Sequence, residues 1–143
     1  MMLIKEIAVC VNILNSRIKK YFFDKLQENG INITPEQYLV LDILWEQQSL
    51  SQQNIANIIQ KDKNSVTKII DSLEKKNLVR RVVDKNDRRI NKIELTDEGL
   101  ALEKITTEVA INFMNDVVKG IDNQELDTYV NVMKKLINNL EGK

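Results

Sequence analysis

Apolar residues recur every three or four positions along most of this 143-residue chain, which is the spacing of one face of an α-helix. The pattern predicts a long first helix over residues 3–28. A second helix is predicted from residue 35 to about residue 48, because Thr34 can cap its start and Gln37 can complete a capping box. The expected inward positions are Ile4, Ile7, Val11, Leu14, Ile18 and Tyr21 in the first helix and Tyr38, Leu41, Leu44 and Trp45 in the second.

Two shorter helices are predicted in the middle of the chain, on either side of a polar turn at residues 60–62. Ser51 can cap the first of them, which carries Ile55, Ile58 and Ile59. The second has a buried stripe at Val66, Ile69, Ile70 and Leu73. The positions off this stripe are lysines and short hydrogen-bonding residues, which suit base edges and phosphates: Lys63, Asn64, Ser65, Thr67, Lys68 and Ser72.

A β-hairpin is predicted after these helices. Asn77 suits the left-handed backbone that ends a helix, and residues 78–83 and 89–95 then indicate strands around a polar loop. Thr96 is the expected cap of a fifth helix that ends at Gly120, with apolar positions Leu102, Ile105, Val109, Phe113 and Val117. Asp122 and Glu125 indicate the start of a last helix, with apolar positions Leu126, Val130, Met133, Ile137 and Leu140.

This order of elements predicts a mainly α protein with a small β-hairpin wing. We expect one domain over residues 1–143, with a winged helix-turn-helix core at residues 34–96. Residues 1–30 and 100–143 are expected to form dimerisation helices, because their apolar stripes lie outside the core and need a partner surface. A homodimer would also supply a second reading helix for a second DNA half-site.

The distribution of charge favours a polyanionic partner, although the chain has no net charge. Residues 61–92 contain eleven basic and five acidic residues, a net charge of +6, and the rest of the chain carries the opposite charge. Segregation of this kind suggests a middle segment that meets a polyanion and flanks that do not. A solvated basic face is the alternative interpretation of the same pattern.

Residue types that most catalytic and metal sites need are scarce. The chain has no histidine and one cysteine, Cys10, so neither an internal disulfide nor an ordinary His/Cys zinc site is expected. Without a glycine-rich phosphate loop or paired carboxylates, we expect no enzyme activity and no cofactor or metal. The longest uncharged run near the start, residues 7–16, is far too short to span a membrane, so a cytoplasmic protein with no membrane partner is expected.

The sequence resembles the MarR family of bacterial transcriptional regulators in three stretches. They are ITPEQYLVLDILWE in the second helix, IANIIQKDKNSVTKIIDSLEKKNLVRR in the helix-turn-helix and DRRINKIELTDEG in the wing. The wing is the most specific of these, with Asp87, Arg89 and then Ile93, Leu95 and Thr96 at the family's positions. Gln60 and Lys61 depart from the glycine and the apolar residue that are frequent in the turn between the third and fourth helices.

The resemblance implies a sequence-specific regulator of transcription, expected to be a ligand-responsive repressor that binds a pseudo-palindromic operator in double-stranded DNA as a homodimer. In this family the wing arginine enters the minor groove and the aspartate two residues earlier positions it, roles that fall here on Arg89 and Asp87. Lys85 and Arg88 would contact the DNA backbone near the wing. The major groove would be read by Asn64, Ser65, Thr67 and Lys68, and phosphates would be bound by Ser51, Lys63, Lys75 and Lys76.

The resemblance also implies a small effector, often phenolic in this family, bound between the dimerisation helices and the DNA-binding lobe. Tyr21, Tyr38 and Trp45 are candidates to line that cleft, although aromatic residues at helical spacing more often pack in the core. Cys10 stands where the peroxide-sensing OhrR branch has a reactive cysteine. Its neighbours Val9 and Val11 offer no cation that would lower the thiol pKa, so an inert, buried cysteine is expected.

A protein-protein adaptor is the competing hypothesis from another functional class. It would use the winged helix as a docking surface and would present an acidic or apolar face on the fourth helix. Lys63 and Lys68 on that face argue against an adaptor.

Overall fold

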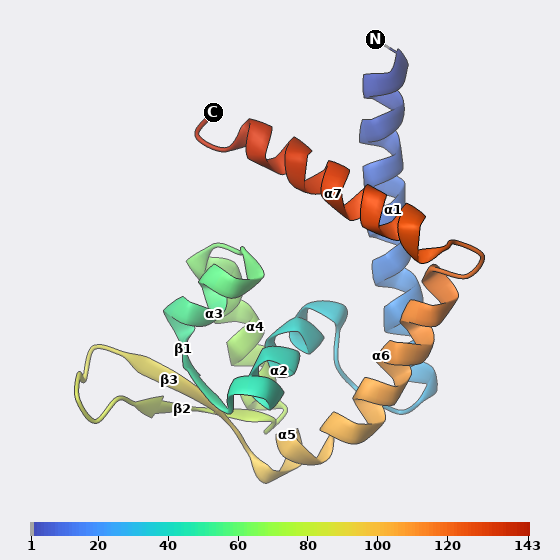
Figure 1. The fold of residues 1–143 in the computed structure, drawn as a ribbon. Helices are drawn as coiled ribbons and strands as arrows, with labels where there is room; N and C mark the ends of the chain where they lie inside the picture. The colour runs from blue at the N-terminus through green and yellow to red at the C-terminus, as the bar shows by residue number, and fades with distance from the viewer. Residues whose placement is uncertain (1) are drawn as a thin grey trace. The chain divides into compact units, whose positions relative to one another are not determined.

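The computed structural model describes residues 2–143, which form a mainly helical chain with a small antiparallel sheet (Figure 1). The chain divides into two compact units, at the bond between Phe113 and Met114. In order, the elements are α1 (Met2–Glu28), α2 (Pro35–Gln47), β1 (Ser49–Ser51), α3 (Gln52–Ile59), α4 (Lys63–Lys75), β2 (Val79–Val83), β3 (Asn91–Leu95), α5 (Asp97–Ala101), α6 (Glu103–Val117) and α7 (Asn123–Leu140).

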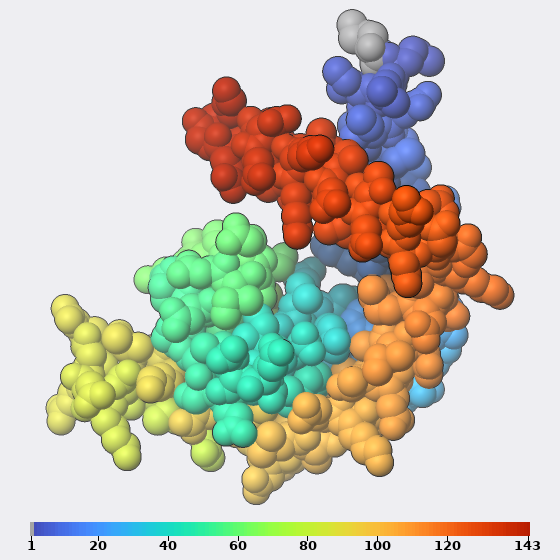
Figure 2. Space-filling view, in the orientation of Figure 1, coloured from blue at the N-terminus to red at the C-terminus, as the bar shows by residue number. Residues whose placement is uncertain are grey.

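The centre of the first unit is a winged helix fold, as predicted. Helix α4 packs against α2 and α3, and the three strands adjoin this helical core. The predicted stripe of α4 is buried at all four positions, and the helices that it packs against also bury apolar residues, namely Leu41 and Leu44 of α2 and Ile55 of α3. Figure 2 shows the hairpin of β2 and β3, in yellow-green and yellow, projecting from the green body of these helices.

A third strand supports the hairpin, and the sequence did not reveal it. The strand order is β1-β3-β2, with Ile93 of β3 opposite Leu50 on one side and Arg81 on the other. Strand β1 has three residues, too few for an alternating pattern to be recognised. An isolated two-stranded hairpin is marginally stable, so β1 anchors the base of the wing.

Local capping signals correctly predicted the starts of α2, α3, α5 and α7. Thr34 and Gln37 form the complete capping box of α2. Ser51 ends β1 and also caps α3, because its Oγ accepts a hydrogen bond from the backbone N–H of Asn54 at 3.0 Å. Thr96 and Asp122 cap α5 and α7 in the same way.

The structure has two helices, α5 and α6, where the sequence predicted a single fifth helix. The helix is interrupted at Leu102 between α5 and α6, and Gly99 of α5 approaches the backbone of Leu78 closely. The buried face of α6 also differs from the expected stripe. Val109 and Phe113 are buried as predicted, but Ile105 is exposed, and the other buried residues of this helix are Thr106 and Ala110.

Much of the apolar surface of α1 and α7 is exposed in the single chain. Helix α1 buries Phe22 and Leu26 near its end, whereas most of its predicted stripe, including Ile4 and Val11, faces solvent. No residue of α7 is buried. Within residues 2–143, no helix has the length and apolar character needed to cross a membrane.

Candidate nucleic-acid interface

The start of the predicted reading helix, α4, is fixed by Asp62. Its Oδ1 accepts a hydrogen bond from the backbone N–H of Ser65 at 2.8 Å, and its Oδ2 accepts one from the Ser65 hydroxyl at 2.9 Å. These bonds lower the pKa of Asp62, with the backbone bond contributing most. The preceding Gln60 adopts the left-handed conformation with φ of 55°, so the turn forms without the glycine that is frequent there.

The outward side chains of α4 fall into two groups. Lys63, Asn64 and Lys68 are exposed, and within residues 2–143 the structure gives their side chains no hydrogen-bond or ion-pair partner. The Thr67 hydroxyl, by contrast, donates a hydrogen bond to the carbonyl oxygen of Lys63 at 2.9 Å and accepts one from Nε2 of Gln52 at 2.6 Å. Gln52 belongs to α3, and the sequence analysis missed it because a contact between helices leaves no local signal.

An aspartate and an arginine form a two-point ion pair at the tip of the wing. Nε and Nη2 of Arg89 lie 3.1 and 3.0 Å from the two carboxylate oxygens of Asp87, and the Arg89 backbone N–H donates to Oδ1 at 3.0 Å. The hydrogen bonds to Arg89 lower the pKa of Asp87, and the same pair raises the pKa of Arg89. The Arg89 side chain is nonetheless 90% exposed, so Asp87 holds one edge of the guanidinium group while most of the side chain stays accessible to solvent.

A second aspartate shapes the wing loop. Oδ1 of Asp84 accepts a hydrogen bond from the backbone N–H of Asn86 at 2.7 Å, and its Oδ2 lies 3.7 Å from Nζ of Lys92. The Asn86 bond is the main reason why the pKa of Asp84 is lowered. Lys85 and Arg88 project from this ordered loop into solvent.

The reading helix, the start of α3 and the wing surround one open groove of about 540 Å³. Lys63 of α4 and Arg89 of the wing both line it. The backbone N–H groups at the start of α3 add positive potential along the same groove. Its remaining lining residues are Ser51, Gln52, Gln53, Asn54, Ala56, Ile90 and Asn91.

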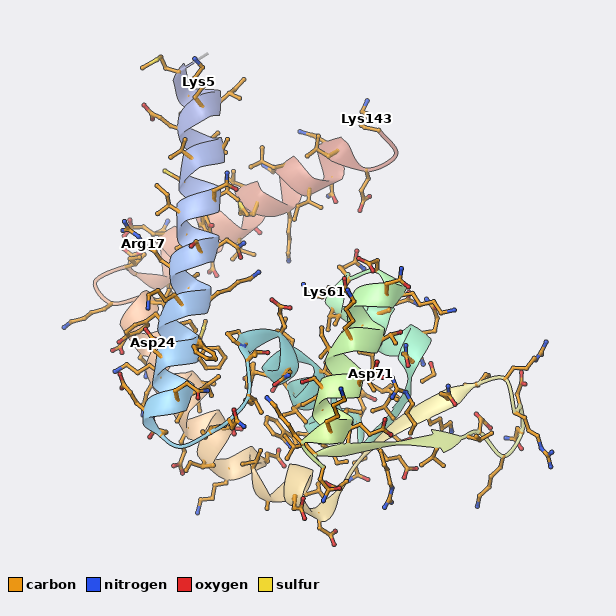
Figure 3. The ribbon with its side chains drawn as sticks, turned by 180° about the vertical axis from the view of Figure 1, so that it is seen from behind. Lys5, Arg17, Asp24, Lys61, Asp71 and Lys143 are labelled. Carbon is orange, nitrogen blue, oxygen red and sulfur yellow. The ribbon has the colours of Figure 1, made fainter. Side chains whose placement is uncertain are left out.

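The arginines at the base of the hairpin have partners within the protein. Nη2 of Arg81 lies 2.6 Å from Asp71 and its Nη1 lies 2.7 Å from Glu74, both on α4. Figure 3 labels Asp71 on the part of α4 that lies beside the strands. Arg80 pairs with Glu94 of β3 at 3.3 Å. These ion pairs connect strand β2 to the reading helix α4 and to strand β3.

Lys76 also has an intrachain role, which argues against the phosphate contact expected for it. Its Nζ donates hydrogen bonds to the carbonyl oxygen of Asn32 at 2.9 Å and to Oε1 of Gln37 at 2.8 Å. Burial lowers the pKa of Lys76. The other end of the Gln37 amide donates to the Ser72 hydroxyl at 2.8 Å. Lys75, one residue earlier, is exposed.

The three aromatic residues suggested for an effector cleft belong to one aromatic cluster. Tyr38 meets Phe22 edge-on at a ring distance of 5.0 Å and Trp45 at 6.3 Å. Tyr21 lies 5.9 Å from Phe113, which stacks on Phe22 at 4.6 Å. Tyr21 is exposed and Tyr38 is half-buried, so the cluster reaches the surface on that side.

Trp45 is the most buried of these three suggested residues, and its indole N–H already has a hydrogen-bond partner. The indole Nε1–H donates a hydrogen bond to the carbonyl oxygen of Gly99 at 2.9 Å. Burial raises the pKa of Tyr38 and of Asp42, which interact with each other one helical turn apart on α2. Trp45 therefore acts as a core residue that connects α2 to α5.

Cys10 is exposed in the single chain, so the expectation of a buried thiol was wrong. The reason is that this part of α1 buries no side chain within the chain. Among residues 2–143 the structure contains no cluster of three or more Cys, Asp or Glu side chains arranged to hold a metal ion.

Comparisons with known proteins agree with this geometry. The profile of the MarR family matches residues 33–90. PrsX of Escherichia coli, an HTH-type transcriptional regulator, is 30% identical over 129 residues, which cover 89% of this chain and 76% of PrsX. MdtR of Bacillus subtilis, an HTH-type transcriptional repressor, is 33% identical over 97 residues, or 68% of this chain and 61% of MdtR. The structure of the S. aureus MepR–DNA complex has a TM-score of 0.85 at 26% identity and covers 93% of this chain and 97% of MepR.

Proposed function

The chain belongs to the MarR family of transcriptional regulators, and we propose that it binds a specific sequence in double-stranded DNA as a homodimer. The observation that carries this proposal is the groove in which Lys63 of α4 and Arg89 of the wing lie together with the start of α3. One DNA duplex can then meet the reading helix and the wing at the same time. The DNA complex of the related MepR supports this interpretation.

The contacts divide into base reading and backbone binding. The exposed side chains of Asn64 and Lys68 suit base edges in the major groove, with Ser65 and Thr67 beside them. Lys63, Lys75 and Ser51 would bind phosphates, and Lys85 and Arg88 would contact the DNA backbone next to the wing. Arg89, held by Asp87, would enter the narrow, electronegative minor groove.

A homodimer would cover the apolar residues that α1 and α7 leave exposed. Ile4, Ile7, Val11 and Leu14 of α1 are each at least 40% exposed, and α7 exposes Val130, Ile137 and Leu140. Exposed apolar positions on this scale mark an interaction surface in a protein of this size. Two-fold symmetry would place two reading helices on a pseudo-palindromic operator.

We further propose that the protein represses transcription and that a small, phenolic effector releases it from the DNA. Similarity to MdtR, a repressor, supports the direction of regulation. Tyr21 and Tyr38 form the accessible side of the aromatic cluster, and Trp45 closes it toward the core. An effector that inserted between these rings would disturb the contacts of α1 with α2 and α6.

Selection of duplexes from a random DNA pool by the purified protein, at near-physiological salt, tests the proposal. We expect a two-fold motif with half-sites about one helical turn, roughly 10 bp, apart. The affinity for that motif should fall steeply with salt, by about 0.9 in log K per neutralised phosphate for each tenfold rise. A folded dimer that enriches no motif, or that binds with a flat salt response, would refute the DNA-binding function.

The wing is tested with two matched arginine variants. Arg89→Ala removes the exposed arginine of the wing tip, whereas Arg80→Ala removes an arginine that pairs with Glu94 at the base of the hairpin. Arg89→Ala should weaken binding to the selected duplex more than Arg80→Ala does. Equal losses would mean that the wing contributes only its general charge.

A further inference from the structure

The side chain of Thr67 is held in one orientation by two hydrogen bonds. Its hydroxyl hydrogen is donated to the carbonyl oxygen of Lys63 at 2.9 Å, within α4. A hydroxyl has one hydrogen to donate, so the group 2.6 Å away on Gln52 must be the amide NH₂, which donates to Thr67 Oγ1. This assignment fixes the direction of both hydrogen bonds.

The consequence is that the polar part of Thr67 is already used inside the protein. Threonine in a helix divides between two rotamers, because its hydroxyl can bond to the carbonyl group one turn earlier. The additional bond from Gln52 favours the rotamer in which the hydroxyl lies between the two helices. Thr67 remains half-exposed. Because its hydroxyl hydrogen is already donated to Lys63, we take the γ-methyl to be the group that Thr67 offers to a DNA base.

We propose that Gln52 is a positioning residue that fixes Thr67 so that the Thr67 methyl group recognises the 5-methyl group of one thymine in each half-site. Contact between a threonine methyl and the thymine methyl is a direct way to distinguish thymine from the other bases in the major groove. This inference rests on the proposed DNA-binding function, because it assigns a base preference to one position of the reading helix.

The location of Gln52 fits such a role. It is the first residue of α3, and the Ser51 cap fixes the backbone of that helix start. Its side chain is half-buried and lines the same groove as Lys63 and Arg89. The next residue, Gln53, is a suitable control because it does not bond to Thr67. It is exposed, and its amide donates a hydrogen bond to Asn57 within its own helix at 3.1 Å.

The test measures thymine recognition separately from overall affinity. The selected duplex is prepared in versions in which deoxyuridine replaces each thymine in turn, which removes the 5-methyl group and retains every base hydrogen bond. For the wild-type protein, one replacement in each half-site should weaken binding roughly fourfold per contact, the value that corresponds to one buried methyl group. Replacements elsewhere should have little effect.

Substitutions then identify the residues responsible. Thr67→Ser keeps the hydroxyl and lacks the methyl, so it should bind the thymine and deoxyuridine duplexes equally. Thr67→Val keeps a methyl and should retain part of the discrimination. Gln52→Ala should reduce the discrimination because it releases Thr67, whereas Gln53→Ala should leave it at the wild-type value. Circular dichroism melting of each variant shows that it is folded.

The outcomes separate this inference from the function on which it rests. If the folded wild-type protein selects no duplex, the proposed function fails and this inference fails with it. If it selects a duplex but no thymine replacement weakens binding, or if Thr67→Ser discriminates as well as wild type, the inference alone is wrong. If Gln52→Ala lowers the affinity for all duplexes equally and keeps the discrimination, Gln52 has a purely structural role and its assignment as a positioning residue is refuted.

Discussion

Lys75 and Lys76 are neighbours in the sequence with different surroundings, and replacing each by glutamine should separate a DNA contact from a structural one. The ammonium group of Lys76 bonds to the Asn32 carbonyl and to Gln37, a residue that is only 6% exposed. Through Gln37 it connects the segment before α2 to the end of α4. Lys75 is exposed at the end of the reading helix and has no such partner among residues 2–143.

The expected magnitudes follow from these surroundings. A hydrogen bond to a charged group contributes about 1.5–3 kcal/mol when it is well buried. Because Lys76 is only partly buried, solvent screening reduces this value, and we expect Lys76→Gln to lower the free energy of unfolding by about 1 kcal/mol. For a chain of this size that loss lowers the melting temperature by about 4 °C.

Lys75→Gln should have the opposite profile. Its melting temperature should equal that of the wild type, because no contact within the chain is lost. If each protomer of a dimer uses Lys75 to neutralise one phosphate, the slope of log K against log salt should become shallower by about 1.8. Lys76→Gln should leave that slope unchanged.

Two measurements decide between these roles. Circular dichroism melting at equal protein concentrations gives the stability of each variant, because the melting temperature of a dimer depends on concentration. Fluorescence anisotropy with the selected duplex at several salt concentrations gives the slopes. If Lys76→Gln melted like the wild type and reduced the salt slope as Lys75→Gln does, the structural role assigned to Lys76 would be refuted.

Three further predictions concern the core, the wing and α1. A Cβ added in Gly99→Ala would lie 2.1 Å from the Leu78 carbonyl oxygen, so this variant should lose about 2 kcal/mol or more of stability, and unchanged denaturant unfolding would contradict this. Because Arg89 lowers the pKa of Asp87, their ion pair should persist until the pH falls through that lowered pKa. The ratio of the wild-type DNA affinity to that of Asp87→Asn should therefore stay constant from about pH 5 to pH 8 in anisotropy titrations. A ratio that drifts within this range would count against the pairing. The sequence neighbours of Cys10, Val9 and Val11, carry no charge, so mild peroxide should release neither the wild type nor Cys10→Ser from DNA. Release of the wild type alone would identify Cys10 as reactive.

The parts of the fold that the sequence predicted are those governed by local rules. The stripe of α4 and the caps at Thr34, Ser51 and Thr96 depend on residues within one or two helical turns. Strand β1 was missed because its pairing with β3 joins segments more than 40 residues apart. The bond between Gln52 and Thr67 was missed for the same reason, since neither residue type indicates which partner it will meet.

The charge count shows why composition alone overstated the basic surface. Of the eleven basic residues between residues 61 and 92, Arg80 and Arg81 pair with carboxylates of the sheet and α4, Lys76 bonds to Asn32 and Gln37, and Lys92 lies near Asp84. These four cations lie near the end of α4 or on the paired strands of the hairpin, and Arg89 at the tip of the wing is also engaged, by Asp87. Four basic side chains without such partners among residues 2–143 lie in the first half of the reading helix and at the tip of the wing, where a polyanion could reach both. They are Lys63, Lys68, Lys85 and Arg88. The net charge of +6 thus matters less than its division into engaged and open cations, which only the tertiary structure determines.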